Sequence, residues 1–253
     1  MISRSDDYVE YCRETTKKAR DLHDLSLRGR HLKEVTQLVH QQIAEEIALG
    51  PGDDLVDIGC GDGTLLRIAA TLGARSATGL LATEEEVDLV RRSGLNVRQA
   101  FSHQLPLPDL CASVVVCNNV LLVVPRANIP ASLREIHRIA RIEARIYIGE
   151  IPAAQPKDPT PRFASRREAL LFMYKKHGLR SWFGMLRRMA WWQITGKQPI
   201  IAAGTAISFF ATPEEFTVLA NSAGLDVVRH WRHEHYQGRN NYLLRKNEFT
   251  VGE

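Results

Sequence analysis

The chain has 253 residues, of which 44% are hydrophobic and 25% are charged, and its formal net charge is +4. This length and apolar content can bury the core of one large α/β domain, while the mild charge gives no argument for a nucleic-acid partner. No uninterrupted apolar run approaches the roughly 20 residues that cross a bilayer, and the polar start lacks the apolar core of a signal peptide. We therefore expect a single cytoplasmic domain over residues 1–253.

Hydrophobic periodicity predicts the secondary structure of the first 151 residues. Residues 1–49 form an N-terminal helical segment, because apolar residues recur at helical spacing from residue 30 until the Gly50-Pro51-Gly52 stop. Short apolar strands then alternate with amphipathic helices. The predicted strands are 55–58, 76–81, 95–99, 112–117 and 146–151, and the predicted helices are 64–72, 83–92 and 129–141. This alternation indicates βαβ units and a parallel, twisted sheet.

The pattern breaks after the fifth predicted strand. Residues 152–161 contain four prolines, and residues 162–197 contain nine lysines and arginines against one acid, with three of the four tryptophans. We expect residues 152–208 to form a linker and a helical, basic aromatic insertion. A helix over 212–224 and strands over 226–231 and 241–245 complete the α/β pattern.

The most informative segment is the turn after the first predicted strand. Gly59, Gly61 and Gly63 alternate with other residues immediately before a helix. Side chains at such positions would keep a small molecule away from the backbone, and the N–H groups of a helix start are free donors. A dinucleotide fingerprint requires its third glycine at position 64, which is Thr64 here, so the spacing argues against NAD.

With Asp57 two residues before the first glycine, this segment resembles the first motif of class I S-adenosylmethionine-dependent methyltransferases, and the likeness extends over about residues 30–246. Shorter stretches of the chain also resemble this family, at residues 105–109, 133–138, 212–216 and 223–224. The resemblance implies a Rossmann-like fold, with a seven-stranded, mostly parallel sheet flanked by helices and a reversed last strand. It implies S-adenosylmethionine as the cofactor. Residues 239–246 also resemble the ends of methyltransferases from bacterial surface-polysaccharide pathways.

The resemblance also implies a cofactor site and shows where this chain departs from it. Leu81 and Phe101 occupy positions at which the family often carries acids for the ribose hydroxyls and the adenine amino group, and Ser113 replaces an acid that often begins the fourth strand. Phe101 could instead stack on a purine, and Glu84 or Glu85 could reach the ribose. The implied cofactor residues are Asp57, Gly59, Cys60, Gly61, Gly63, Leu81, Phe101, Ser102 and Asn118.

A hydroxyl acceptor would benefit from a general base at the carboxyl ends of the strands, where ligands of open α/β sheets bind. The candidate catalytic residues are Asn118, Glu150 and His103. Asn118 could equally orient a ligand or cap its turn, and His103 could be a solvated loop residue. We expect no metal at His230, His233 and His235, because no cysteine or aspartate joins them at ligand spacing.

The leading functional hypothesis is methyl transfer from S-adenosylmethionine to an oxygen, less favourably a nitrogen, of a small-molecule or glycan acceptor. The alternatives are a weak or inactive methyltransferase-like binding protein and a nucleic-acid methyltransferase. The basic aromatic segment allows three interpretations: a lid over the acceptor, a contact with the inner membrane surface that suits a lipid-linked or anionic acceptor, and nucleic-acid binding. The last is the least favoured, and the sequence predicts no oligomeric state.

Overall fold

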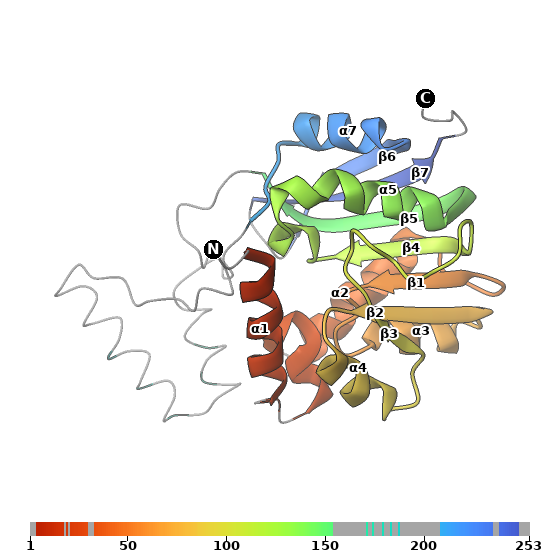
Figure 1. Cartoon of the computed structure of the whole chain (residues 1–253). Helices are drawn as coiled ribbons and strands as arrows, with labels where there is room; N and C mark the ends of the chain where they lie inside the picture. The colour runs from red at the N-terminus through yellow and green to blue at the C-terminus, as the bar shows by residue number, and fades with distance from the viewer. Residues whose placement is uncertain are drawn as a thin grey trace.

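The computed structural model describes residues 4–17, 19, 21–29, 33–153, 208–234 and 238–247, with five separate positions between 171 and 187. Its centre is a seven-stranded sheet in the order β3-β2-β1-β4-β5-β7-β6 (Figure 1). The strands are β1 (Asp54–Ile58), β2 (Ser76–Leu81), β3 (Val97–Gln99), β4 (Ala112–Asn118), β5 (Ala140–Pro152), β6 (Leu225–Arg232) and β7 (Arg239–Lys246). The first five strands pair in parallel, and β7 runs antiparallel to both of its neighbours. The predicted sheet with a reversed last strand is confirmed.

Helices cover both faces of the sheet. One hydrophobic cluster joins α5 and α7 to the sheet, and a second joins α2, α3 and α4 to the opposite face. Figure 1 shows α5 and α7 in front of the sheet and α2 and α3 behind it. The helices are α1 (Arg4–Lys17), η1 (Leu22–Gly29), α2 (Lys33–Glu46), α3 (Thr64–Thr71), α4 (Glu84–Arg91), η2 (Leu121–Val123), η3 (Arg126–Asn128), α5 (Ile129–Ile139) and α7 (Pro213–Ser222).

The central strand β4 shows why its sequence is a continuous β-branched run. Val115 and Cys117 pack in the cluster of α5, whereas Val114 and Val116 pack in the cluster of α2 and α3. Successive side chains of a strand point to opposite faces, so a strand that is covered on both faces needs apolar residues throughout.

The structure differs from the sequence prediction at β5, which starts at Ala140, six residues earlier than predicted. The predicted N-terminal helical segment contains α1, η1 and α2. The early part of β5 pairs Ala140 with Ala112 and then shifts register, with Glu143 at a φ of 64°. This part contains the charged residues Arg141, Glu143 and Arg145, so its sequence lacks the apolar run that marks a buried strand.

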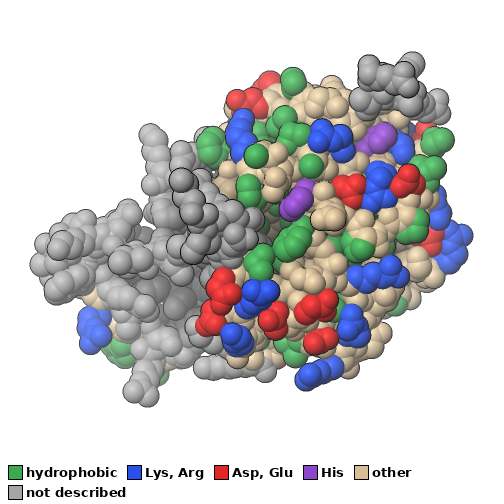
Figure 2. Space-filling view, in the orientation of Figure 1, with side chains coloured by type: hydrophobic (Ala, Val, Ile, Leu, Met, Phe, Trp, Pro, Cys, Tyr) green, Lys and Arg blue, Asp and Glu red, His purple; other side chains and the backbone are tan. Residues whose placement is uncertain are grey.

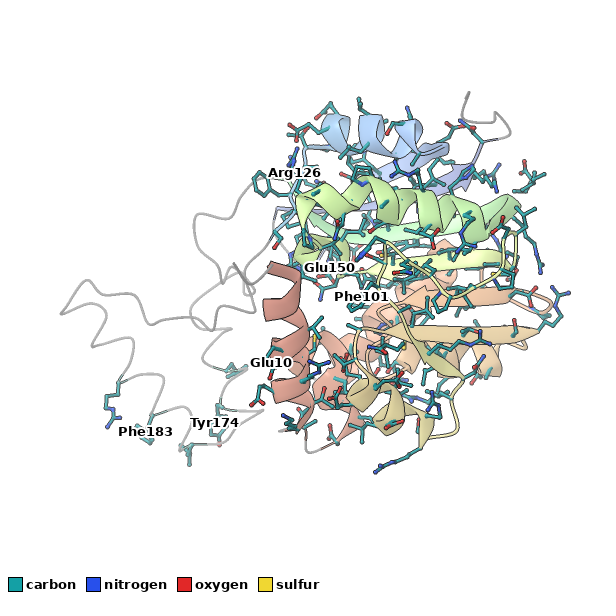
Figure 3. All side chains as sticks on the ribbon, in the orientation of Figure 1. Glu10, Phe101, Arg126, Glu150, Tyr174 and Phe183 are labelled. Atoms are coloured by element: carbon teal, nitrogen blue, oxygen red, sulfur yellow. The ribbon has the colours of Figure 1, made fainter. Side chains whose placement is uncertain are left out.

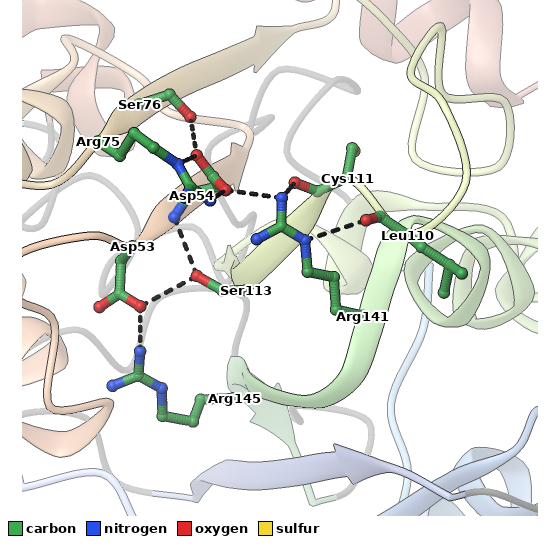
Figure 4. A network of polar contacts seen from close by, with 9 residues as sticks. All are labelled: Asp53, Asp54, Arg75, Ser76, Leu110, Cys111, Ser113, Arg141 and Arg145. Carbon is green, nitrogen blue, oxygen red and sulfur yellow. Dashed lines mark hydrogen bonds and ion pairs between the residues drawn. The ribbon is translucent and has the colours of Figure 1, made fainter.

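A polar network ties together the amino ends of the parallel strands, at the opposite end of β1 from the glycine turn. Ser113 Oγ donates to Asp53 Oδ1 at 3.0 Å and accepts from the Asp54 N–H at 2.9 Å. Ser113 therefore has a structural role, because it links the starts of β1 and β4. Figure 4 shows the whole network, which consists of Asp53, Asp54, Arg75, Ser76, Leu110, Cys111, Ser113, Arg141 and Arg145.

The predicted linker and insertion over residues 152–208 lie mostly outside the described residues. The five separate positions within them are helical, and all five side chains are exposed: Leu171, Tyr174, Leu179, Phe183 and Arg187. None of the helices in the described part of the chain is long and apolar enough to cross a membrane. The described face in Figure 2 carries acidic and basic side chains interspersed over the sheet-covering helices.

Candidate active site

The glycine turn has the geometry that its spacing predicts. Gly59 and Gly61 have φ values of 77° and 56°, in the left-handed region that L side chains rarely adopt. The N–H groups of Gly59 and Cys60 both donate to Leu80 O, at 2.8 and 3.2 Å, which holds the turn against the end of β2. The backbone therefore passes close to the carboxyl edge of the sheet without side chains in the way.

A cavity of about 130 Å³ lies beside this turn, at the carboxyl ends of β1, β2 and β4. Val9 of α1 and Leu25 of η1 line it from the side opposite the strands. Ligand sites usually measure about 300–1,000 Å³, so this cavity has to widen to hold a nucleoside-sized ligand. In Figure 3, Phe101 and Glu150 lie at this edge of the sheet, next to α1.

A larger groove of about 1070 Å³ runs between η1, α2 and α3. Its described lining comes from helices and loops and includes Asp62 and Thr64 of the segment after the glycine turn. Because open α/β sheets bind their ligands outside the carboxyl ends of the strands, the smaller cavity is the candidate site.

The structure brings most of the predicted site residues to the cavity wall, and the others lie behind it. Cys60 is buried against β2, where a Cβ at Gly79 would lie 2.5 Å from its Sγ. Gly63 begins α3 and packs against Leu95. The predicted residues on the wall are Gly59, Gly61, Leu81, Phe101, Ser102, His103 and Asn118, and those behind it are Asp57, Cys60, Gly63 and Glu150.

Asp57 is a buried acid directly behind the turn. Burial, together with the negative charge of Asp62, raises the pKa of Asp57 to about 7. Its Oδ2 accepts no hydrogen bond from the described part of the chain. By contrast, hydrogen bonds from His23 and Thr64 outweigh burial and lower the pKa of Asp62. The turn therefore holds one carboxyl group that is easily neutralised and one that stays ionised.

Glu150 sits in a buried polar network just below the cavity. Asn118 Nδ2 donates to its Oε1 at 3.2 Å, and Arg239 binds its Oε2. Arg239 Nη1 also donates to Asn119 Oδ1 at 3.1 Å, and the Glu150 N–H donates to Asn241 Oδ1 at 3.0 Å. This arrangement favours a positioning role for Glu150, because its carboxylate is already engaged by an amide and a guanidinium.

Phe101 and His103 form a stacked pair at the cavity wall, with ring centroids 5.8 Å apart and planes inclined by 20°. Phe101 is 39% exposed, so its ring has a free surface for another planar group. Between them, Ser102 is buried and its Oγ lies 2.9 Å from Ser132 Oγ of α5. Ser102 therefore anchors the loop, and the two rings stay at the wall.

Sequence reasoning missed one acidic residue of the cavity. Glu84 and Glu85, either of which could have reached the ribose, are both exposed, whereas Glu86 is buried and lines the cavity. The correction follows from helical spacing: Val87 and Val90 are fully buried, and Glu86 lies four residues before Val90 on the same side of α4. The spacing of Glu86 from Val90 is therefore the feature of the sequence that could have predicted its burial.

Comparison with known proteins agrees with this geometry. Residues 56–148 match the model of the methyltransferase domain family. A methyltransferase domain therefore lies in this part of the chain. A malonyl-(acyl-carrier protein) O-methyltransferase from Serratia marcescens is 35% identical to this chain over 98 residues. That match covers 36% of this chain and 35% of the Serratia enzyme, about a third of its length.

Solved structures share the fold over nearly the whole chain. A SAM-dependent methyltransferase from Leishmania major has a TM-score of 0.64 at 12% identity, covering 97% of this chain and 87% of its own. The (4+2)-cyclase SpnF has a TM-score of 0.58 at 16% identity, covering 95% of this chain and 93% of its own. At these identities the likeness shows the fold alone, and the cyclase illustrates that one fold hosts different chemistries.

S-adenosylmethionine is the cofactor that this methyltransferase domain implies, and two features of the cavity fit it. Gly59 and Gly61 leave the turn open to a ligand, and the part of Phe101 that is exposed suits contact with a purine. Asn118 also lines the cavity, but its Oδ1 is buried against Gly149 and receives no hydrogen bond from the described residues. Among the described residues, no three His, Cys, Asp or Glu side chains gather to hold a metal, and His235 lies outside them.

Proposed function

We propose that this methyltransferase transfers a methyl group from S-adenosylmethionine to an oxygen atom of a small-molecule acceptor. The observation that carries the proposal is the cavity itself, in which the open glycine turn, Asn118 and His103 meet at the carboxyl edge of the sheet. The partial match to an O-methyltransferase supports oxygen as the accepting atom.

When bound, the cofactor supplies an electrophilic methyl carbon, so the chain has to align the acceptor and exclude water. Asn118 is fixed by its hydrogen bond to Glu150 and presents its amide at the wall. His103 is the wall residue that could take a proton from an acceptor hydroxyl, with its ring held against Phe101. Val9 and Leu25 add apolar side chains to the cavity wall.

The glycan and lipid-linked acceptors gain no support from the likeness of residues 239–246 to polysaccharide enzymes. This segment is β7, in which Arg239 and Asn241 hold Glu150. A structural requirement therefore explains these residues without reference to the acceptor. The basic aromatic segment that suggested a membrane surface or nucleic acid lies outside the described residues.

The test begins with calorimetric titration of S-adenosylmethionine. Wild type should bind with micromolar affinity, and Gly61→Val should lose binding because its side chain enters the cavity. The matched control is Gly94→Val, because Gly94 also has a left-handed φ, of 83°, lies away from the cavity and has nothing within 4 Å of its Cβ position. Equal binding by Gly61→Val would contradict the assigned site.

Methyl transfer is then assayed with methyl-labelled cofactor and a panel of hydroxyl, carboxyl and amine compounds. Label recovered on oxygen supports the proposal, whereas label on nitrogen or carbon contradicts the choice of atom. A second candidate, nucleoside binding without methyl transfer, is favoured by the apolar Leu81 and Phe101 at positions where the resemblance implies acids. Binding without turnover on the whole panel would favour that candidate.

A further inference from the structure

A second cleft, of about 300 Å³, lies between α2 and the sheet. Helix α2 supplies one side of it, and β5, β6 and β7 supply the other through Tyr147, Trp231 and Asn241. None of the described residues that line this cleft also lines the candidate cofactor cavity. Its volume is at the lower end of the range for small-molecule sites, so it can hold a ligand of a few non-hydrogen atoms.

The charged side chains around this cleft are acidic. Its described lining includes Glu45, Glu46 and Glu234, and it includes no lysine or arginine. Glu45 forms no ion pair with any residue that the structure describes. Glu234 accepts a hydrogen bond from Gln42 Nε2 at 3.5 Å, which is long and therefore weak. The cleft should therefore attract a cation and repel an anion.

Two aromatic rings form part of the same wall. Tyr147 and Trp231 meet edge to face, with ring centroids 5.9 Å apart and planes inclined by 63°. The guanidinium carbon of Arg229 lies 4.3 Å from the centroid of Trp231, and Arg229 also pairs with Glu46. Arg229 is not among the described residues that line the cleft. The chain thus holds one cation of its own between an aromatic ring and a carboxylate here, and a cationic ligand would meet the same two kinds of group.

The hydroxyl group of Tyr147 is a separate indication of a ligand. Tyr147 lines the cleft and is only 2% exposed, and its hydroxyl forms no hydrogen bond with the described part of the chain. Burial, followed by the negative charge of Glu150, raises the pKa of Tyr147, so the hydroxyl keeps its proton and can donate. A donor in a buried side chain is costly without a partner, and an oxygen atom of a ligand would supply one.

We propose that this cleft binds a small organic cation, with its ammonium group beside Glu45 and Trp231 and an oxygen atom at the Tyr147 hydroxyl. The inference goes beyond the proposed function, because the cleft is separate from the cofactor cavity. An organic cation fits better than a metal ion, since an aromatic wall attracts ammonium groups. In addition, no three His, Cys, Asp or Glu side chains of the described residues gather to hold a metal.

The experiment is a titration of the full chain, without S-adenosylmethionine, followed by NMR at the indole N–H of Trp231. This signal is assigned by its loss in Trp231→Leu. The ligand is choline, which has a quaternary ammonium and a hydroxyl, and the reference is its uncharged analogue with carbon in place of nitrogen. Glu45→Gln removes one charge from the cleft. Glu34→Gln is the matched control, because it makes the same change at an exposed position of α2 outside the cleft.

Choline should shift the Trp231 signal with millimolar affinity, and the uncharged analogue should bind about tenfold more weakly. Glu45→Gln should weaken choline binding by about twofold to fivefold, as expected for an exposed charge, and Glu34→Gln should leave it unchanged. Equal binding of choline and its analogue would overturn the proposal. Equal binding of choline by Glu45→Gln and Glu34→Gln, or no shift of the Trp231 signal with choline, would overturn it as well.

Tyr147→Phe tests the place of the oxygen atom while keeping the aromatic ring. The variant should bind choline about twofold to tenfold more weakly than wild type, the usual effect of one hydrogen bond. It should bind tetramethylammonium, which has no oxygen, as wild type does. A Tyr147→Phe variant that binds choline like wild type would contradict the proposed contact with the hydroxyl.

Discussion

A Cβ atom at Gly59 would lie 2.3 Å from Cγ2 of Val120. Both residues line the cavity, so the glycine turn after β1 and the loop after β4 touch at the floor of the site. This contact explains why the first glycine of the turn must lack a side chain even when no ligand is present.

Gly59→Ala should lower the free energy of unfolding by about 2–4 kcal/mol, because it adds left-handed backbone strain to a clash. In the double variant, Val120→Ala should remove the clash and recover the part of the unfolding free energy that the clash costs. The effects of the two changes on stability should therefore not be additive. Urea unfolding measures both effects. Gly94→Ala, at a φ of 83° with open space, controls for backbone strain. Strict additivity of Gly59→Ala and Val120→Ala would contradict the contact.

Asp57 should make the protein less stable as the pH rises from about 4 to about 7, because its pKa is raised from 3.8 to about 7 by burial. In this window the folded state keeps a proton that the unfolded chain releases, which costs at most about 1.4 kcal/mol per pH unit. Asp57→Asn removes this dependence. The stability of the variant relative to wild type should therefore grow up to about pH 7 and then level off, as urea unfolding at a series of pH values would show. A difference independent of pH would refute the raised pKa.

The buried pair of Glu150 and Arg239 should behave as a unit. Removing one partner leaves a charge without its partner, so Glu150→Gln or Arg239→Met should each cost about 3–5 kcal/mol of unfolding free energy. The double variant should cost less than the sum of the two. An exposed pair supplies the control, since Arg245 and Glu143 lie 3.9 Å apart at the surface, and Glu143→Gln should cost less than about 1 kcal/mol. Equal costs for the buried and the exposed pair would argue against the network.

Asp54 should contribute to stability in the opposite pH window from Asp57. A hydrogen bond from Arg75, with further bonds from Ser76 and Arg141, holds the pKa of Asp54 well below 3.8. Its stabilisation is present above that value and is lost as the pH falls below about 4. Wild type should therefore lose stability on acidification more steeply than Asp54→Asn. The control is Asp88→Asn, which removes an exposed partner of Arg91 and should lose stability at low pH as steeply as wild type. Thermal unfolding at a series of low pH values compares the stability of the three proteins.

Much of the architecture could be predicted from local patterns. The apolar run of β4, the capping box at Thr83 and the alternating glycines each depend on residues close together in the chain, and the structure places each of them as expected. The start of β5 was predicted too late, because Ala140 becomes a strand only through its pairing with Ala112.

By itself, the sequence determined the sheet, its helices and the turn that marks the site, because hydrophobic periodicity and glycine spacing act over a few residues. Only the tertiary structure decided which charges face the cavity. It joined Arg239 to Glu150 across 89 positions of the chain, and it buried Glu86 while leaving Glu84 and Glu85 in solvent. Such choices depend on how distant elements pack, since burial and pairing of a charge are properties of the folded surroundings and not of the residue.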